Sequence, residues 1–563
     1  MVRARLLAGL LKIGAGAAAA AFVGNRAEER LRLSRAKHRS LTGHVRMGKR
    51  VAGLIPFYEF DRSAFFQADG APAEVAARRE AGFARLSALY RERFPKTAAL
   101  AAEMREAIPD IAFTSRYRVP FPFSRVVREQ LPSGSFYQSA EGVMLTDLDG
   151  NRFYDCTGSY GVNLLGTDAY RRMVAQGIAA TDSLGPVLGG LHPVTADNVR
   201  RLQALSGLDA VSFHMSGTEA VMQAVRLARY HTRRSHVVRF AGAYHGWWGD
   251  VQPGIGNPVP ADKTYTLADM SDETLEVLAT RRNIACVLVN PLQALHPNVG
   301  AAGDSALVDS SRRAGAGGEG VDRAAYSTWL ARLSDTCRKA GIVLIVDEVF
   351  TGFRLAKGGA CEYFGVRPDL VTYGKTLGGG LPVGVLCGRA DLMRRYREDR
   401  PADICFARGT FNSHPYVMGA MDAFLSWHAS AEADAAYRGL DERWNERAAT
   451  LNARLAAEGL SPRVANLGTV WSLFYTRPSR YNWMLQYYLR AEGLALGWTG
   501  TGRLIFSLAY GGAEFAEVAD RIVAAARAME QDGWTWAPEG ADNRTIKRQI
   551  LREMLGRRLR SAG

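Results

Sequence analysis

Two short apolar runs, each followed by a reactive side chain, constrain the fold of this chain most strongly. Val343–Asp347 is rich in β-branched residues and ends in a carboxylic acid, whereas Asp369–Tyr373 leads through Gly374 to Lys375. Runs of this length and composition predict buried strands of a parallel sheet. Because α/β proteins bind ligands beyond the carboxyl ends of such strands, we expect the acid and the amine to lie at one ligand site.

Apolar runs alternate with helical stretches from residue 166 to residue 395. The further runs are Ala210–His214, Val237–Phe240 and Ala285–Asn290. This order predicts a large α/β domain with a doubly wound, mainly parallel sheet. The polar, glycine-rich stretch 301–320 interrupts the pattern and predicts an exposed loop.

Smaller units are expected around the large domain, since 563 residues are enough for two or three domains. The predicted segments are a basic and apolar N-terminal arm (1–50), a helical accessory region (51–115) broken at Pro95, the N-terminal part of a small α+β domain (116–165), the large domain (166–395), the C-terminal part of the small domain (396–542) and a basic tail (543–563). Leu148–Phe153 predicts a hairpin with a type I′ turn.

The net charge of +15 is concentrated at the two ends of the chain. Met1–Arg50 has a net charge of +10 and Asn543–Gly563 has one of +6, which leaves the residues between them nearly neutral. The ends also lack the interleaved aromatic residues of a nucleic-acid binder, so no nucleic-acid partner is expected. They favour an acidic carrier protein or a membrane surface as partner.

The first apolar segment, Leu6–Val23, allows three interpretations. It is mostly Ala and Gly and contains Lys12, which makes it weak as a membrane span of about 20 apolar residues. A membrane-surface or partner-binding arm, a helix packed on the enzyme, and a true span or export signal all remain open. At the other end, Thr545–Arg560 is predicted to be an amphipathic helix that either docks on the chain or meets a partner or membrane.

The spacing of the cysteines indicates the redox state of the compartment in which the protein is expected. Six of them are scattered without a CxxC pair, which favours reduced thiols in the cytoplasm over a disulfide frame or a metal site. A peripheral position at the inner face of a membrane would follow if the N-terminal arm binds lipid.

Three further motifs follow predicted strands of the large domain. Ser216-Gly217-Thr218 opens a helix and could bind phosphate through backbone N–H groups, although such a sequence is also an ordinary helix cap. Tyr244 could lie over a ring or pack in the core, and Thr410, in a turn before a helix, could add a hydroxyl to the phosphate. Taken singly, each has a structural explanation. Together with Asp347 and Lys375 they indicate pyridoxal phosphate (PLP), which needs a lysine to bond to its aldehyde and an acid beside its pyridine nitrogen.

The chain resembles the class III, fold type I, PLP-dependent aminotransferases. Within that family it is most similar to the glutamate-1-semialdehyde 2,1-aminomutases. The segments that carry the resemblance are Ser216–Gly246, Leu344–Arg354 and Pro368–Gly384, with weaker matches at Asp147–Gly161 and Gly409–Ala420. The resemblance implies a large domain with a mainly parallel doubly wound sheet, a smaller α+β domain and, in this chain, an N-terminal helical extension.

The resemblance also assigns roles to residues at matching positions. Lys375 would bond to the cofactor and move the substrate proton, and Asp347 would pair with the protonated pyridine nitrogen. Tyr244 would stack on one face of the ring and Val349 would pack on the other.

Further implied contacts concern the phosphate, the ring oxygen and the substrate. Ser216, Gly217 and Thr218 would bind the phosphate, Gln293 would approach the ring's 3′-oxygen, and Ser159 and Tyr160 would contact the substrate. Thr410 would reach the phosphate site of a neighbouring subunit, so the resemblance implies a homodimer with shared active sites.

Departures from the aminomutase pattern narrow the expected reaction. The aminomutases carry a long mobile lid after their Tyr-His-Gly, whereas Trp247–Ala268 is short here. A short lid favours a two-substrate aminotransferase that moves an amino group from an amino acid, plausibly glutamate, to a ketone or aldehyde. The segments Asn290–Gln293 and Ser413–Pro415 resemble aminotransferase domains that act on acyl chains held by carrier proteins.

One feature favours the alternative, an intramolecular aminomutase. Arg125 stands at about the spacing from Gly150 at which the aminomutases hold a carboxylate-binding arginine. It could equally be a surface arginine near a domain edge.

Overall fold

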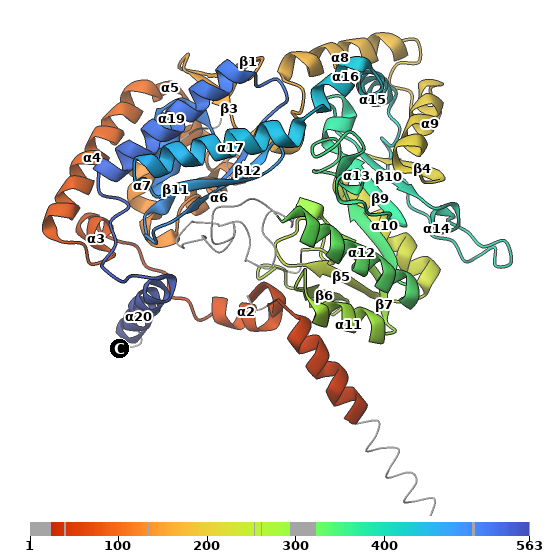
Figure 1. Ribbon diagram of the computed structural model, residues 1–563, viewed down its shortest axis with the longest axis horizontal. Helices are drawn as coiled ribbons and strands as arrows, with labels where there is room; N and C mark the ends of the chain where they lie inside the picture. Colours follow the sequence, from red (N-terminus) through yellow and green to blue (C-terminus); the bar gives the residue numbers. More distant parts are fainter. Residues whose placement is uncertain are drawn as a thin grey trace, which may run out of the picture.

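A computed structural model describes residues 24–38, 41–132, 134, 136–252, 254–260, 262–292, 322–497 and 502–561. Leu6–Val23, Gln293 and the stretch 301–320 lie outside the described residues. Figure 1 shows a large sheet domain beside a smaller α+β body, with the N-terminal helices wrapped around the smaller body.

The large domain is built on a seven-stranded sheet of order β4-β10-β9-β8-β7-β5-β6. All neighbouring strands are parallel except that β10 runs antiparallel to both β4 and β9. The strands are β4 (Ala210–His214), β5 (His236–Phe240), β6 (Thr264–Leu267), β7 (Ile284–Val289), β8 (Val343–Asp347), β9 (Leu370–Gly374) and β10 (Gly384–Gly388). The prediction of a mainly parallel sheet is confirmed, and β6 and β10 are the two strands that it missed.

Helices cover both faces of this sheet, as a doubly wound fold requires. On β8, Val343 and Ile345 pack into the cluster that includes α10, whereas Leu344 and Val346 pack into the cluster that includes α12. The helices of this domain are α8 (Thr167–Thr181), α9 (Val194–Ser206), α10 (Gly217–Thr232), α11 (Asp272–Thr280), α12 (Arg323–Ala340), α13 (Gly359–Phe364), α14 (Ala390–Met393), α15 (Pro415–His428) and α16 (Ala431–Tyr437).

The smaller body contains two short sheets, β1-β2-β3-β13 and β11-β12-β14. Their strands are β1 (Tyr137–Glu141), β2 (Met144–Asp147), β3 (Arg152–Asp155), β11 (Pro462–Leu467), β12 (Val470–Tyr475), β13 (Leu494–Ala495) and β14 (Arg503–Ile505). The helices packed with them are α17 (Leu440–Ala457), α18 (Leu485–Ala491) and α19 (Gly512–Gln531).

The hairpin between β2 and β3 forms as predicted, but its turn is not type I′. A type I′ turn needs positive φ at both central residues, and among the turn residues only Gly150 has positive φ, at 84°. The Asp147 carboxylate instead accepts from the backbone N–H groups of Asp149 and Asn151, at 3.0 and 2.9 Å. Asp147 therefore stabilises a wider turn with a single left-handed glycine, because its side chain competes for the backbone donors.

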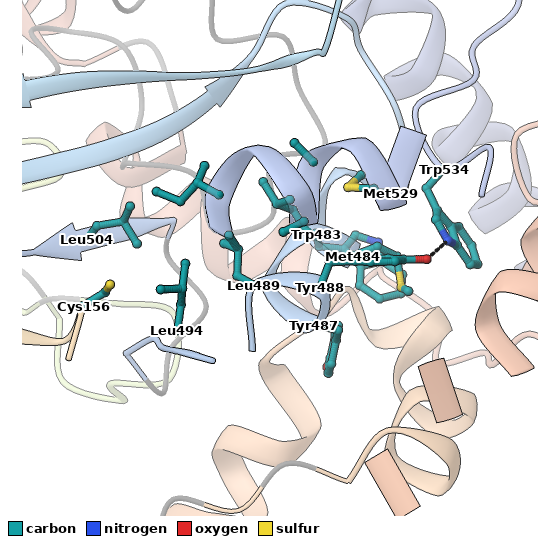
Figure 2. Close-up of a cluster of buried hydrophobic side chains, with 14 of the residues drawn as sticks. Cys156, Trp483, Met484, Tyr487, Tyr488, Leu489, Leu494, Leu504, Met529 and Trp534 are labelled. Carbon is teal, nitrogen blue, oxygen red and sulfur yellow. Dashed lines mark hydrogen bonds between the residues drawn. The ribbon is translucent and has the colours of Figure 1, made fainter. Parts of the chain in front are cut away.

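The N-terminal helices share one hydrophobic core with the smaller body. Phe65 and Phe83 lie 6.3 Å from the ring of Trp534, and Figure 2 shows Trp534 beside Tyr488, to which its indole nitrogen donates at 2.8 Å. A helical break at Pro95 is confirmed. The helices are α2 (Val45–Ala52), α3 (Arg62–Gln67), α4 (Ala73–Arg93), α5 (Pro95–Glu103), α6 (Pro109–Tyr117) and α7 (Ser124–Gln130).

The C-terminal helix α20 (Asn543–Ser561) docks one face on this core. Ile546 is buried, and Glu553 pairs with the buried Arg480 at 2.5 Å. Of the two alternatives for the tail, docking on the chain itself is therefore observed for this face. Among the described residues, no helix is long and apolar enough to cross a membrane.

A buried ion pair lies within the N-terminal helical region, and its arginine is also bonded to the smaller body. Arg79 donates to both oxygens of Asp69, at 2.8 and 2.6 Å, and its Nε donates to the carbonyl of Gly533 at 3.0 Å. Both side chains are buried. Such a pair is costly to break because one charge then stays buried without its partner.

We predict that Asp69→Ala lowers the free energy of unfolding by about 3–5 kcal/mol. The double variant Asp69→Ala/Arg79→Met should lose less, because no buried charge is left unpaired. Denaturant unfolding followed by tryptophan fluorescence measures both. Asp520→Ala, which breaks the exposed pair with Arg454, is the control and should cost about 1 kcal/mol or less; a similar loss there would contradict the explanation.

Candidate active site

Asp347 and Lys375 meet at the carboxyl edge of the sheet. β8 and β9 are parallel neighbours in which Asp347 pairs with Thr372, and Lys375 follows three residues beyond Thr372. The carboxylate ends its strand and the amine begins the turn after the neighbouring strand. The topology therefore brings the two predicted residues to one edge.

Asp347 is 2% exposed and is held by three donors. His245 Nδ1 lies 2.7 Å from Oδ2, while Thr372 Oγ1 and the backbone N–H of Val349 donate to Oδ1 at 3.2 and 3.1 Å. Charge-assisted bonds of this kind stabilise an ionised carboxylate that is removed from water. Asp347 is thus oriented to receive a cationic N–H group.

His245 is a site residue whose role the sequence did not reveal. Burial lowers the pKa of its imidazole, partly offset by the neighbouring Asp347. The ring is therefore neutral near pH 7, and the proton on Nδ1 is donated to Asp347. Nε2 is buried and has no hydrogen-bond partner within the described part of the chain. The motif Tyr244-His245-Gly246 carried the signal, but only the sheet order shows that His245 faces Asp347.

Lys375 has left-handed backbone geometry, with φ at 49°. Its pKa is lowered chiefly by burial and further by the Arg354 guanidinium, against an opposing effect of Asp347. A lowered pKa increases the fraction of neutral amine, which is the nucleophilic form. Nζ lies 5.4 Å from the centre of the Phe350 ring.

Ser216, Gly217 and Thr218 open helix α10, as predicted. Ser216 is the N-cap, and its hydroxyl accepts from the N–H of Glu219 at 3.3 Å. The first N–H groups of a helix have no partner within it and attract anions. These residues thus present backbone donors beside the carboxyl edge of the sheet.

Close packing leaves room for only glycine at two places around these donors. A Cβ on Gly217 would lie 2.5 Å from Val349 Cγ1, and a Cβ on Gly246 would lie 2.5 Å from Thr218 Oγ1. Val349 is therefore packed against the helix start. The donors, the oriented carboxylate and the buried lysine together fit PLP: α10 would hold the phosphate, Asp347 the pyridine nitrogen and Lys375 the aldehyde.

Tyr244 and Thr410 are the more exposed predicted residues. Tyr244 is 59% exposed, and its carbonyl accepts from Asn290 at 3.4 Å. Thr410 lies exposed in the turn before α15. Their side chains are open to solvent in the single chain. Gln293 lies outside the described residues.

Ser159 and Tyr160 belong to a left-handed turn next to Lys375. Gly158, Ser159, Tyr160 and Gly161 have φ of 49°, 46°, 55° and 101°. A Cβ on Gly161 would lie 3.1 Å from Lys375 Cδ. Non-glycine residues persist in this conformation only where their surroundings impose it, and such strain gathers at functional sites.

Arg354 imposes that conformation. Its Nη2 donates to the carbonyls of Gly161 and Asn163, at 3.1 and 2.8 Å. Its Nη1 donates to Thr469 Oγ1 and to the Phe506 carbonyl, both at 3.1 Å. The guanidinium is fully buried. Its hydrogen bonds join the large domain to three segments of the smaller body. Its position in the motif that follows Asp347 gave no sign of this role.

Arg125 lies on α7 and contacts the N-terminal region. Its Nε is 3.5 Å from Glu59 Oε2, and its Nη2 donates to the carbonyl of Phe60 at 3.3 Å. These contacts fit the interpretation of a surface arginine. The carboxylate-binding role for Arg125 stays a prediction.

The family model described as "Aminotransferase class-III" matches residues 126–251 and 314–526, more than half of the chain. A glutamate-1-semialdehyde 2,1-aminomutase of Nitratidesulfovibrio vulgaris is 35% identical over 360 residues, which span 61% of this chain and 76% of that protein.

Solved structures show the same fold. A transaminase with PLP bound has a TM-score of 0.61 at 25% identity, covering 78% of this chain and 98% of that one. A glutamate-1-semialdehyde aminomutase from Pseudomonas aeruginosa PAO1 has a TM-score of 0.63 at 20% identity, covering 81% and 99%.

We predict that His245→Leu weakens PLP binding roughly ten- to hundredfold, because Asp347 loses a charge-assisted hydrogen bond. His245→Asn should retain most of the affinity, since an amide N–H can donate from near the Nδ1 position. Titration of the apoprotein with PLP measures both dissociation constants. An unchanged constant in the leucine variant would show that His245 only fills space.

Arg354→Met should lower the stability by about 3 kcal/mol or more, because the methionine leaves buried acceptors without donors. Its kcat/KM should fall by more than tenfold, as the turn at Ser159 and Tyr160 relaxes. Arg354→Lys keeps the charge but reaches fewer acceptors, so its stability and its kcat/KM should lie between those of the wild type and of the methionine variant. Thermal unfolding and steady-state kinetics test this. If the methionine variant is less stable but keeps the wild-type kcat/KM, Arg354 stabilises the fold without supporting the geometry of the site.

Proposed function

The chain belongs to the class III aminotransferase family and is a PLP-dependent enzyme, and we propose on that basis that it moves an amino group between two substrates. The donor is an amino acid, with glutamate as the first candidate, and the acceptor is a ketone or an aldehyde. PLP, when bound, supplies an electron sink for the carbon–hydrogen bond that breaks during amino transfer.

The chain's own residues divide the work around that cofactor. Asp347, oriented by His245, would hold the proton on the pyridine nitrogen of bound PLP. The backbone N–H groups at the start of α10 would bind the phosphate and so orient the ring. Lys375 Nζ, with its lowered pKa, would accept the proton from the substrate carbon and pass it to the cofactor.

The observation that carries the proposal is the anchoring of the short segment after Gly246 at Asp250 and Val251. Val251 is buried, and the Asp250 carboxylate accepts from Arg229 Nη1 at 2.5 Å. Thr264 Oγ1, on β6, donates to the Asp250 carbonyl at 2.8 Å, so Asp250 is tied to helix α10 on one side and to the sheet on the other. A short segment that is anchored at Asp250 and Val251 is poorly suited to close over an intermediate and retain it, which supports exchange with a second substrate.

A second candidate is a 2,1-aminomutase of the glutamate-1-semialdehyde type. The similarity to curated aminomutases supports it. In that reaction one compound would lose and regain its amino group without an external donor.

We also propose a homodimer with shared active sites. Large exposed side chains occur in the segments around the site, including Tyr244, Trp247, Phe406 and Phe411. Burial of such residues against a second copy would be favourable. Thr410, in the same exposed turn as Phe411, would then reach the phosphate site of the neighbouring subunit.

An acyl chain on an acidic carrier protein or on a lipid remains the proposed acceptor class.

We predict that glutamate added without acceptor converts the visible absorption band of the lysine-bound cofactor into that of the aminated cofactor. A ketone or aldehyde acceptor should restore the first band. Lys375→Ala should lack the lysine-bound band, still take up PLP and show no turnover. Absorption spectroscopy of the purified holoenzyme measures all three.

Two outcomes would redirect the assignment. If the enzyme ignores glutamate and isomerises glutamate-1-semialdehyde with no donor present, the aminomutase is the function. Substantial turnover by Lys375→Ala would contradict the role of the lysine in both reactions.

A further inference from the structure

The segment after α2 meets the C-terminal helix α20 on one side of the molecule. Tyr58 Oη donates to Glu553 of α20 at 3.4 Å, and the Arg557 guanidinium lies 5.7 Å from the Tyr58 ring. Only residues 53–57 separate Tyr58 from the end of α2. Figure 1 shows α2 and α20 along the same side. Both elements lie outside the part of the chain that matches the family model.

Helix α20 has two different faces. The docked face includes Ile546, Gln549 and Glu553, and Gln549 Nε2 donates to the carbonyl of Ala68 at 2.8 Å. Where its side chains are described, the opposite face carries cations and hydrocarbon apart from Thr545 in the first turn. Its exposed cations and leucines are Arg544, Lys547, Arg548, Leu551, Arg552 and Leu555. The two leucines are 56% and 53% exposed.

The segment from α2 to Tyr58 continues the same composition. The sequence from residue 44 to residue 57 contains no acidic residue. Arg46 is exposed but pairs with Asp262 at 3.2 Å. The other exposed side chains of this segment are Met47, Arg50, Leu54, Ile55 and Phe57. Phe57 is 63% exposed, and the Arg116 guanidinium lies 5.6 Å from its ring. We call these five residues and the six on α20 the basic–apolar patch.

We propose that the basic–apolar patch docks the enzyme on a membrane surface rich in anionic lipid. Each cation held near such a surface strengthens binding on the order of fivefold. Exposed leucine, isoleucine and phenylalanine side chains can enter the boundary between headgroups and acyl chains, as they do in interfacial helices. This proposal does not depend on which amino-transfer reaction the enzyme performs.

The composition of the patch favours lipid over an acidic protein. On the described part of the exposed face of α20, the only neutral hydrogen-bonding side chain is Thr545, and its hydroxyl already donates to Asp542 at 2.7 Å. A specific protein partner would be expected to use more such groups. A lipid surface requires only charge and hydrocarbon. The chain that precedes the described residues points the same way, because Leu6–Val23 contains a single charged side chain, Lys12.

Vesicle co-sedimentation of the full-length holoenzyme tests the proposal. We expect binding to vesicles of phosphatidylcholine and phosphatidylglycerol in equal parts, weakened by salt, and little binding to phosphatidylcholine alone. Arg548→Glu/Arg552→Glu should lower the partition coefficient by at least about tenfold. Leu551→Ser/Leu555→Ser should lower it by about tenfold while the salt dependence remains. The control Arg338→Glu/Lys339→Glu, a matched charge reversal on α12, should bind like the wild type.

Several results would overturn the proposal. Equal binding to both vesicle types would show that anionic lipid is not what the patch recognises. Unchanged binding of both α20 variants, in protein with wild-type circular dichroism and PLP content, would place the contact elsewhere. Retention on immobilised polyglutamate that the α20 charge reversal abolishes, without any binding to vesicles, would identify an acidic polypeptide as the partner.

Discussion

The hydrogen bond from His245 to Asp347 is the contact on which the site depends. A carboxylate that is almost completely buried needs donors to stay ionised, and this one receives them from three segments: the loop after β5, strand β9, and its own backbone at Val349. The strand order places these segments together. The sheet topology therefore sets the position of the Asp347 carboxylate, and that position determines where the cofactor's pyridine nitrogen would bind.

Much of the large domain and of the site could be predicted from the sequence. The runs that end at Asp347 and Gly374 are continuous apolar stretches, which is how strands buried on both faces appear in a sequence. Strand β6 was missed because Thr264–Leu267 is short and follows an irregular segment. Strand β10 was missed because Gly384–Gly388 begins and ends with glycine, a residue that weakens the strand signal.

The supporting residues could not be predicted because their roles depend on distant partners. His245 acts on a residue 102 positions away, and Arg354 donates to carbonyls up to 193 positions away. No local pattern encodes such contacts. The turn after β2 was misassigned for a different reason: Asp147 supplies side-chain acceptors that the dipeptide pattern of a hairpin does not include.

Arg354 also constrains the order in which this enzyme can mature during synthesis. Its acceptors lie at residues 161, 163, 469 and 506, so the guanidinium gathers segments that are far apart in the chain. The sheet strands end at residue 388, well before the last acceptor. A nascent chain can therefore complete its sheet on the ribosome while the turn beside Lys375 still lacks its support. The turn beside Lys375 therefore reaches its final geometry only after the C-terminal segments have emerged, which makes the site sensitive to premature termination far downstream of Asp347 and Lys375.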